Sequence, residues 1–220
     1  YVASRHIQAN GPALLRMIAA VGTVDAAIAV ASFRGGTRGW IRPVLHVGAT
    51  STTMTDLRHP LLPRAVPNSI TLAPPHGVLV TGSNMSGKST LLRTVGVNVV
   101  LAQTVNTCMA TVYDAPVLTV RSIIGRGDDL MSGTSYYRDE MEAALTLVHC
   151  SRSRLPHLFL FDELFRGAST VERIAAGEAV LLELLSHHED ESAGPPHTSP
   201  RPGRVVWWPA GAENVSYSDI

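Results

Sequence analysis

The stretch from Gly82 to Thr90 has residue types and spacing that could bind a phosphate group. It contains a complete G-x-x-x-x-G-K-[ST] pattern. Its two glycines let the backbone wrap a phosphate without a Cβ in the way. We expect Lys88 to reach the β- and γ-phosphates of a nucleotide and the Ser89 hydroxyl to hold Mg²⁺. The pattern therefore predicts a phosphate-binding loop made of Gly82, Ser83, Asn84, Met85, Ser86, Gly87, Lys88, Ser89 and Thr90.

A pair of acids forms the second candidate group. Asp162 and Glu163 directly follow the apolar run Leu158-Phe159-Leu160-Phe161. In phosphoryl-transfer ATPases the first acid supports the Mg²⁺ shell, and the second can polarise the attacking water as a general base. The alternative is a solvated strand end. The position of the pair, downstream of a phosphate loop, favours the catalytic interpretation.

A polar, glycine-bearing segment from Gly125 to Ser135 precedes a predicted helix. Thr134 or Ser135 could cap that helix. A serine at a helix N-terminus is also a good donor to a γ-phosphate, because its hydroxyl and the helix dipole point the same way. The two roles are compatible.

Alternating strands and helices must position these groups. The apolar periodicity predicts helices in residues 12–32, 91–105, 136–151 and 171–185, and strands at residues 44–47, 54–57, 77–81, 110–113, 117–122 and 157–161. The proline-rich stretch 60–75 reads as loop and edge strand. This order predicts an α/β fold with a parallel or mixed sheet covered on both faces. The strand before Gly82 and the helix after it would aim backbone N–H groups at one point.

Composition restricts the possible partners. The chain has 220 residues, 45% apolar and 16% charged, which suits one α/β domain with a small appendage. Its net charge is zero, so bulk electrostatics give no case for nucleic acid or an anionic membrane. Cys108 and Cys150 are expected to be buried free thiols in a reducing compartment. We expect no signal peptide and no membrane segment, because Arg16 and Asp25 interrupt the apolar run 14–31.

The end of the chain differs in composition. Residues 187–204 are rich in His, Glu, Asp, Ser, Pro and Gly without a period, which predicts disorder. The run Val205-Val206-Trp207-Trp208 is a possible strand. A candidate metal-binding motif is the run His187-His188-Glu189-Asp190. A solvated tail is the favoured interpretation, because the sequence has no second ligand cluster with a metal-site spacing.

Several motifs together carry a family resemblance. The most specific are the Asn-Met pair inside the phosphate loop and Asp128-Asp129-Leu130. The other matching stretches are residues 58–62, 66–68, 101–103, 140–141, 161–164 and 166–170. Over about residues 14–185 the chain resembles the ATPase domain of the MutS family of DNA mismatch-repair proteins. Residues 162–167 and 171–178 are most similar to the shorter bacterial MutS-related proteins.

The resemblance implies a cytoplasmic phosphate-loop NTPase of the ABC-ATPase type that uses ATP and Mg²⁺. Lys88 would hold the phosphates, Ser89 and Asp162 would bind Mg²⁺, and Glu163 would act on the water. Ser135 of a second subunit would reach the γ-phosphate, so the expected state is a homodimer through the ATPase domains. ATP binding would close the dimer. DNA is implied as a partner by the family alone.

On this interpretation the chain has three parts. Residues 1–60 are a helical lead-in from an upstream helical region, residues 61–186 are the MutS-type ATPase domain, and residues 187–220 are a low-complexity or aberrant tail.

Three features depart from the family pattern. The usual strand followed by a Thr-His pair, whose His senses the γ-phosphate, is not recognisable after residue 186. Arg64-Ala65-Val66 stands where an aromatic residue often stacks on adenine, and Ala168 replaces a polar residue. A nucleotide-gated binding module with little hydrolysis therefore remains an alternative. Another ABC-type ATPase is less favoured, because the chain lacks a Ser-Gly-Gly-Gln type run.

Overall fold

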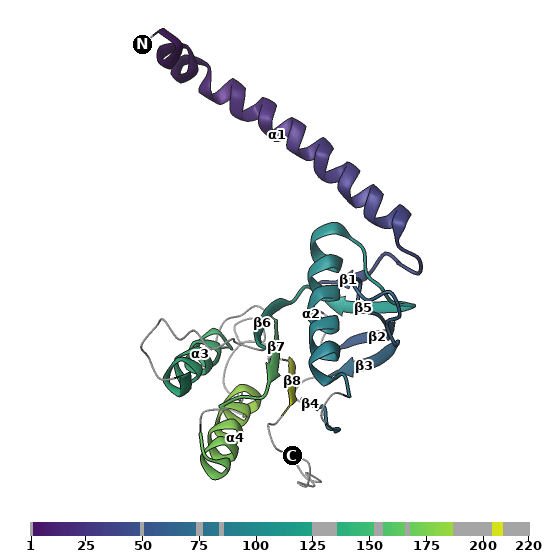
Figure 1. Cartoon of the computed structure of the whole chain (residues 1–220), viewed down its shortest axis with the longest axis vertical. Helices are drawn as coiled ribbons and strands as arrows, with labels where there is room; N and C mark the ends of the chain where they lie inside the picture. Colours follow the sequence, from purple (N-terminus) through teal and green to yellow (C-terminus); the bar gives the residue numbers. More distant parts are fainter. Residues whose placement is uncertain are drawn as a thin grey trace. The chain divides into compact units, whose positions relative to one another are not determined.

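The computed structural model of the chain describes residues 2–48, 51–73, 77–83, 86–124, 136–151, 156–165, 168–186 and 204–208. The chain forms two compact units, Tyr1–Trp40 and Ile41–Ile220 (Figure 1).

The first unit is built on one long helix. Helix α1 spans Val2–Gly36 and continues through Pro12, so the helix predicted in residues 12–32 is confirmed and extends at both ends. Its last turn is closed by Trp40. The indole Nε1 donates to the Arg34 carbonyl at 3.0 Å, and the Arg34 guanidinium carbon lies 4.9 Å from the Trp40 ring centroid.

The apolar residues of α1 between Pro12 and Ala29 are exposed. Leu15, Val21 and Ile28 are more than half exposed. Residues Asn10–Gly36 are long and apolar enough, by length and composition, to cross a membrane, with a mean hydropathy of 1.8 in the best window. A core helix of a soluble protein meets the same criteria. The feature therefore assigns no role to α1.

Four strands of the second unit form a mixed sheet. They are β1 (Val44–His46), β2 (Thr52–Leu57), β3 (Asn68–Leu72) and β5 (Val112–Pro116), in the order β1-β5-β2-β3. Strand β1 is parallel to β5, and the other two pairs are antiparallel. The predicted strands near residues 44 and 54 are confirmed, and the proline-rich stretch supplies the edge strand β3.

A second sheet is parallel throughout its described strands. It contains β4 (Val78–Leu79), β6 (Thr119–Ile123), β7 (His157–Asp162) and β8 (Arg204–Trp208), in the order β4-β8-β7-β6. The possible strand at residues 205–208 is thus confirmed as β8. The expectation of a single sheet was wrong, because β2 pairs in antiparallel fashion with β3 on one side and β5 on the other, instead of joining the parallel sheet.

The described part of this unit contains three helices: α2 (Lys88–Val105), α3 (Tyr136–Ser151) and α4 (Thr170–Ser186). Strand β7 is buried along its whole length, and its side chains alternate between two cores. Leu158 and Leu160 join the apolar cluster that contains the buried face of α2, whereas Phe159 and Phe161 join the cluster of α3 and α4. In Figure 1, α2 lies between the two sheets. The fold is therefore a mixed α/β arrangement whose helices cover both faces of β7.

Candidate functional site

The glycine-rich loop opens α2 through two residues with left-handed backbones. Gly82 has φ 149° and Gly87 has φ 94°. A Cβ on Gly82 would lie 3.1 Å from Ser86 Oγ, so a larger residue would crowd the loop as well as strain it. Gly87 is the N-cap of α2 and provides no side-chain cap. The first turn of α2 can therefore direct its N–H groups toward an anion.

Lys88 holds its charge within this loop. Its side chain is only 9% exposed. Nζ donates to the Gly82 carbonyl at 2.8 Å and also to the Ser83 carbonyl. These contacts fold the long side chain back across the loop backbone, so its ammonium lies at the inner end of the loop, where a bound phosphate would need a counter-charge.

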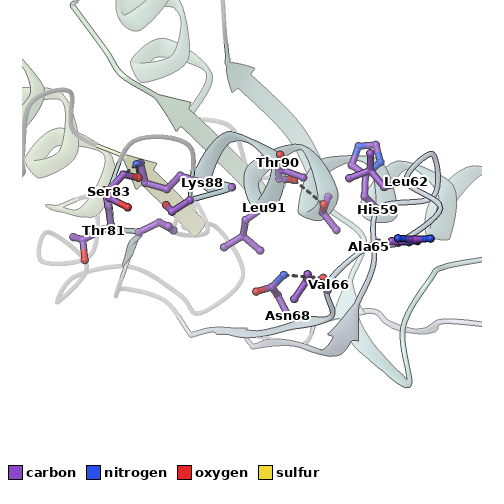
Figure 2. A pocket seen from close by; sticks show the side chains of 16 residues that line it. His59, Leu62, Ala65, Val66, Asn68, Thr81, Ser83, Lys88, Thr90 and Leu91 are labelled. Carbon is purple, nitrogen blue, oxygen red and sulfur yellow. Dashed lines mark hydrogen bonds between the residues drawn. The ribbon is translucent and has the colours of Figure 1, made fainter.

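The loop forms one end of a cavity of about 610 Å³, a size that suits a small-molecule ligand. Figure 2 shows Thr81, Ser83 and Lys88 toward one end and His59, Leu62 and Ala65 toward the other. The complete lining is His59, Leu62, Arg64, Ala65, Val66, Asn68, Val80, Thr81, Gly82, Ser83, Ser86, Gly87, Lys88, Thr90, Leu91 and Thr94. The site thus has a polar loop end and a far end supplied by the segment before β3.

The far end offers aliphatic and cationic side chains. Leu62 and Val66 supply apolar surface, and His59 and Arg64 supply groups that can hydrogen-bond. Leu91 of α2 adds apolar surface between the two ends (Figure 2). Among the described lining residues there is no Phe, Tyr or Trp. A flat ligand group at this end would therefore pack against aliphatic surface or beneath the guanidinium plane of Arg64.

The acid pair leaves the parallel sheet at the same edge as the loop. Leu79 of β4 and Phe161 of β7 are both register partners of Trp207 in β8, so the two strands end at the same level with β8 between them. Parallel strands carry the residues after their carboxyl ends to one edge, where α/β proteins bind ligands. Asp162 and Glu163 are nevertheless not among the residues that line the cavity.

Asp162 has a buried oxygen that no described residue contacts through a hydrogen bond. The residue is 6% exposed, and its Oδ1 makes no hydrogen bond within the described part of the chain. A buried carboxylate oxygen without a partner is costly and calls for a bound water or cation. Carboxylate and hydroxyl oxygens are ligands that Mg²⁺ accepts, so the donor chemistry here fits that ion.

The turn after Asp162 has a strained backbone. Glu163 has φ 51° and Phe165 has φ 60°, and a left-handed non-glycine residue costs about 1–3 kcal/mol. Leu164 and Phe165 are buried in the cluster of α3 and α4, which holds the turn in place. Glu163 stays half-buried between them and the end of β7. The buried neighbours Leu164 and Phe165 maintain the strained backbone of Glu163. Strain maintained in this way is typical of functional residues, which supports a functional role for Glu163 as a hypothesis.

Helix α4 starts from a capping box directly after this turn. The Ser169 hydroxyl and N–H both donate to Glu172 Oε2, at 2.7 and 3.1 Å, and the two hydrogen bonds lower the pKa of Glu172. Ala168 packs against the α3 and α4 cluster. Its methyl group therefore contributes apolar contact where a polar residue was expected.

The structure brings part of the predicted loop together. Six of its members line the cavity: Gly82, Ser83, Ser86, Gly87, Lys88 and Thr90. Ser89 lies in the first turn of α2, half-buried, and does not line it. Asn84, Met85 and Ser135 lie outside the described residues, as do residues 125–134 and 166–167.

Sequence reasoning missed two residues of α2. Thr94 lines the cavity, and the fully buried Asn98 lies one turn further along the helix. The Thr94 hydroxyl donates to the Thr90 carbonyl at 2.6 Å, and Asn98 Nδ2 donates to the Thr94 carbonyl at 2.9 Å. The signal was present as polar residues at i, i+4 and i+8 on a helix face that is otherwise apolar.

Taken together, these features define a mixed α/β protein with a glycine-loop cavity beside an acidic strand end. A family model described as MutS domain V matches residues 78–193. The chain is 33% identical over 158 residues to the DNA mismatch repair protein MutS of Lactococcus lactis subsp. cremoris (strain MG1363), which covers 68% of this chain and 19% of the relative. It is 30% identical over 181 residues to the protein of the same name from Lactobacillus acidophilus, covering 79% of this chain and 21% of the relative.

A third relative, the DNA mismatch repair protein MutS of Streptococcus equi subsp. equi, is 38% identical over 119 residues, covering 53% of this chain and 14% of the relative. The chain belongs to the MutS family. The matched region is 14 to 21% of the length of these three relatives.

Proposed function

We propose that this chain is the ATP-binding and ATP-hydrolysing part of a MutS-like protein acting in DNA mismatch repair or a related DNA transaction. The observation that carries the proposal is the loop end of the cavity, where Lys88 and the open N-terminus of α2 meet. Lys88 and the loop N–H groups would bind the β- and γ-phosphates. The names of the relatives support the link to mismatch repair.

The acids at the end of β7 would serve hydrolysis. Ser89 and Asp162 would hold Mg²⁺. The buried Oδ1 of Asp162 supports that role, because it has no hydrogen-bond partner among the described residues. The ion neutralises charge on the phosphates when it is bound. Glu163 would take a proton from the attacking water. The oxygen of that water would bond to the γ-phosphorus while the bond from the γ-phosphorus to the β–γ bridging oxygen breaks, which releases ADP and inorganic phosphate.

The proposal includes a composite dimer. Phosphate-loop proteins of the ABC-ATPase type complete the site across two subunits, and Ser135 of one subunit would contact the γ-phosphate bound by the other. ATP binding would close this homodimer, and hydrolysis would open it. We propose residues 61–186 as the ATPase domain, with residues 1–60 as lead-in and residues 187–220 as tail. The lead-in contributes β1 and β2, and the tail contributes β8, to the sheets of the same compact unit. The family relationship supports DNA as a partner and a cytoplasmic location.

A second candidate function is a nucleotide-gated binding module with little hydrolysis. Strand β8 ends at Trp208, the register partner of Asp162. No histidine follows it through Ile220, so a γ-phosphate-sensing His does not come directly after this strand. Such a protein would bind Mg·ATP and change its dimer state with slow turnover or none.

Phosphate release from Mg·ATP by the purified chain separates the two candidates. If the chain is an ATPase, the native chain should release phosphate from Mg·ATP. Glu163→Gln should bind ATP within about threefold of the native chain and lose about 10²- to 10⁴-fold in turnover, because a general base is removed. Glu178→Gln is the matched control, since Glu178 is exposed on α4. ATP binding without phosphate release, even at concentrations where the chain is dimeric, would favour the second candidate. Absence of ATP binding would refute both.

A further inference from the structure

Asn98 closes a ring of hydrogen bonds between three separate segments. Its Nδ2 donates to the Arg58 carbonyl at 3.0 Å, and its Oδ1 accepts from the Met109 N–H at 2.7 Å. The Arg58 N–H in turn donates to the Met109 carbonyl at 2.8 Å. The ring joins α2 to the end of β2 and to the segment between α2 and β5. Asn98 is 0% exposed, so water cannot replace these bonds.

The ring connects the two ends of the cavity. On one side, Asn98 lies on the helix that begins with Lys88, and it bonds to the carbonyl of the lining residue Thr94. On the other side, it fixes the carbonyl of Arg58, whose next neighbour His59 begins the far-end segment. This far-end segment, residues 59–68, contributes His59, Leu62, Arg64, Ala65, Val66 and Asn68 to the lining.

A nucleotide in this cavity would place its phosphates at the loop and its nucleoside at the far-end segment. The phosphate contacts come from the loop itself and do not pass through Asn98. The nucleoside contacts depend on where the far-end segment lies relative to α2. From this geometry we infer that Asn98 is a positioning residue for nucleoside recognition: it holds residues 59–68 in register with the phosphate loop. This inference rests on the proposed function and adds the means by which the two ends of the site are aligned.

A matched control is present on the same helix. The Gln103 side chain bonds through Nε2 to the Leu118 carbonyl at 2.9 Å and accepts from the Leu118 N–H. It therefore makes the same kind of amide-to-backbone bridge as Asn98, but it connects α2 to the residue before β6, and neither Gln103 nor Leu118 lines the cavity. Loss of either bridge should lower stability. Only loss of the Asn98 bridge should change the ratio of the dissociation constants for ATP and for a phosphate chain without a nucleoside.

The test compares dissociation constants for Mg·ATP and for inorganic tripolyphosphate with Mg²⁺. Tripolyphosphate carries the phosphate chain without the nucleoside. In Asn98→Leu we expect the affinity for ATP to fall about tenfold or more, equivalent to about 1.4 kcal/mol, while tripolyphosphate binding stays within about threefold because the loop is intact. Asn98→Ser, which is smaller and replaces the amide with a hydroxyl, should give the same direction of change if Asn98→Leu does not fold. Gln103→Leu should keep the native ratio of the two constants.

Three results would count against the inference. An unchanged ratio in folded Asn98 variants overturns it and leaves the proposed function intact. An equal change of the ratio in Gln103→Leu also overturns it, because general loosening of α2 would then explain both effects. If the native chain binds neither ATP nor tripolyphosphate, the proposed function itself fails, and the inference fails with it.

Discussion

Replacing Lys88 with alanine should remove most of the ATP affinity while leaving the fold in place. The ammonium is the one charged group contributed by the glycine loop, and it is buried against the Gly82 and Ser83 carbonyls. Truncation removes the charge and its hydrogen bonds, but it deletes no part of the apolar clusters that contain α2. We therefore expect binding and stability to respond differently.

The size of the effect follows from two opposing contributions. Two unit charges about 4 Å apart near a protein surface attract by about 4 kcal/mol at an effective dielectric constant of about 20. On ATP binding, the Lys88 ammonium would give up a hydrogen bond to a loop carbonyl in favour of the phosphate. Loss of that hydrogen bond offsets about 1.5–3 kcal/mol of the attraction. The net loss is then about 2 kcal/mol if the full exchange occurs and about 4 kcal/mol if the carbonyl contacts persist. These limits correspond to about 30-fold and about 1,000-fold weaker binding.

Isothermal titration of Mg·ATP into the native and Lys88→Ala chains measures this loss directly. Arg93→Ala is the control, because it removes an equal charge from an exposed position of α2 that does not line the cavity. Its dissociation constant should stay within about threefold of the native value, as expected for an exposed charge. A thermal melt of each variant verifies folding. An affinity of folded Lys88→Ala within threefold of the native chain would refute the assignment of the loop as the phosphate site.

Two further predictions concern packing and ionisation. A Cβ on Gly96 would lie 2.8 Å from Cδ1 of the buried Leu160, so Gly96→Val should lower the free energy of unfolding in urea by about 1–3 kcal/mol. Gly96→Ala should lower it less, because the better helix propensity of alanine returns about 1 kcal/mol. An unchanged free energy of unfolding in Gly96→Val would contradict the close approach of α2 to β7. Burial raises the pKa of Cys108 from 9.0 to about 12. The folded chain thus keeps a proton on Cys108 that the unfolded chain loses, so the free energy of unfolding should fall as pH rises above 9. The urea midpoint of Cys108→Ala should decline less between pH 9 and 11 than that of the native chain. Parallel declines of the native and variant midpoints would contradict this prediction.

Local signals in the sequence were sufficient to predict most elements of the second unit. Helix α3 has the predicted bounds, and β7 was predicted within one residue, because strong apolar patterns fix elements that are buried on a definite face. Helix α2 begins three residues before its predicted start, at Lys88 itself, because Gly87 serves as its N-cap. The grouping of the strands into two sheets depends on long-range pairing, which local patterns do not encode.

The site was predictable only in part for the same reason. A contiguous motif identified the loop, and the apolar run before Asp162 identified the strand that carries the acids. The far-end segment and the Asn98 ring join residues about 40 positions apart in the sequence. Their roles follow from tertiary contacts, as does the left-handed backbone of Glu163, which the burial of Leu164 and Phe165 maintains.

Photolabelling with 8-azido-ATP, followed by peptide mapping, shows directly whether this cavity binds the nucleotide. The azide is on the base, so it reports which segment contacts the nucleoside while the loop binds the phosphates. We predict that the label attaches within residues 59–68 of the native chain and that excess Mg·ATP or the Lys88→Ala change prevents it. Labelling confined to another part of the chain, or labelling that ATP does not block, would contradict the assignment of this cavity as the nucleotide site.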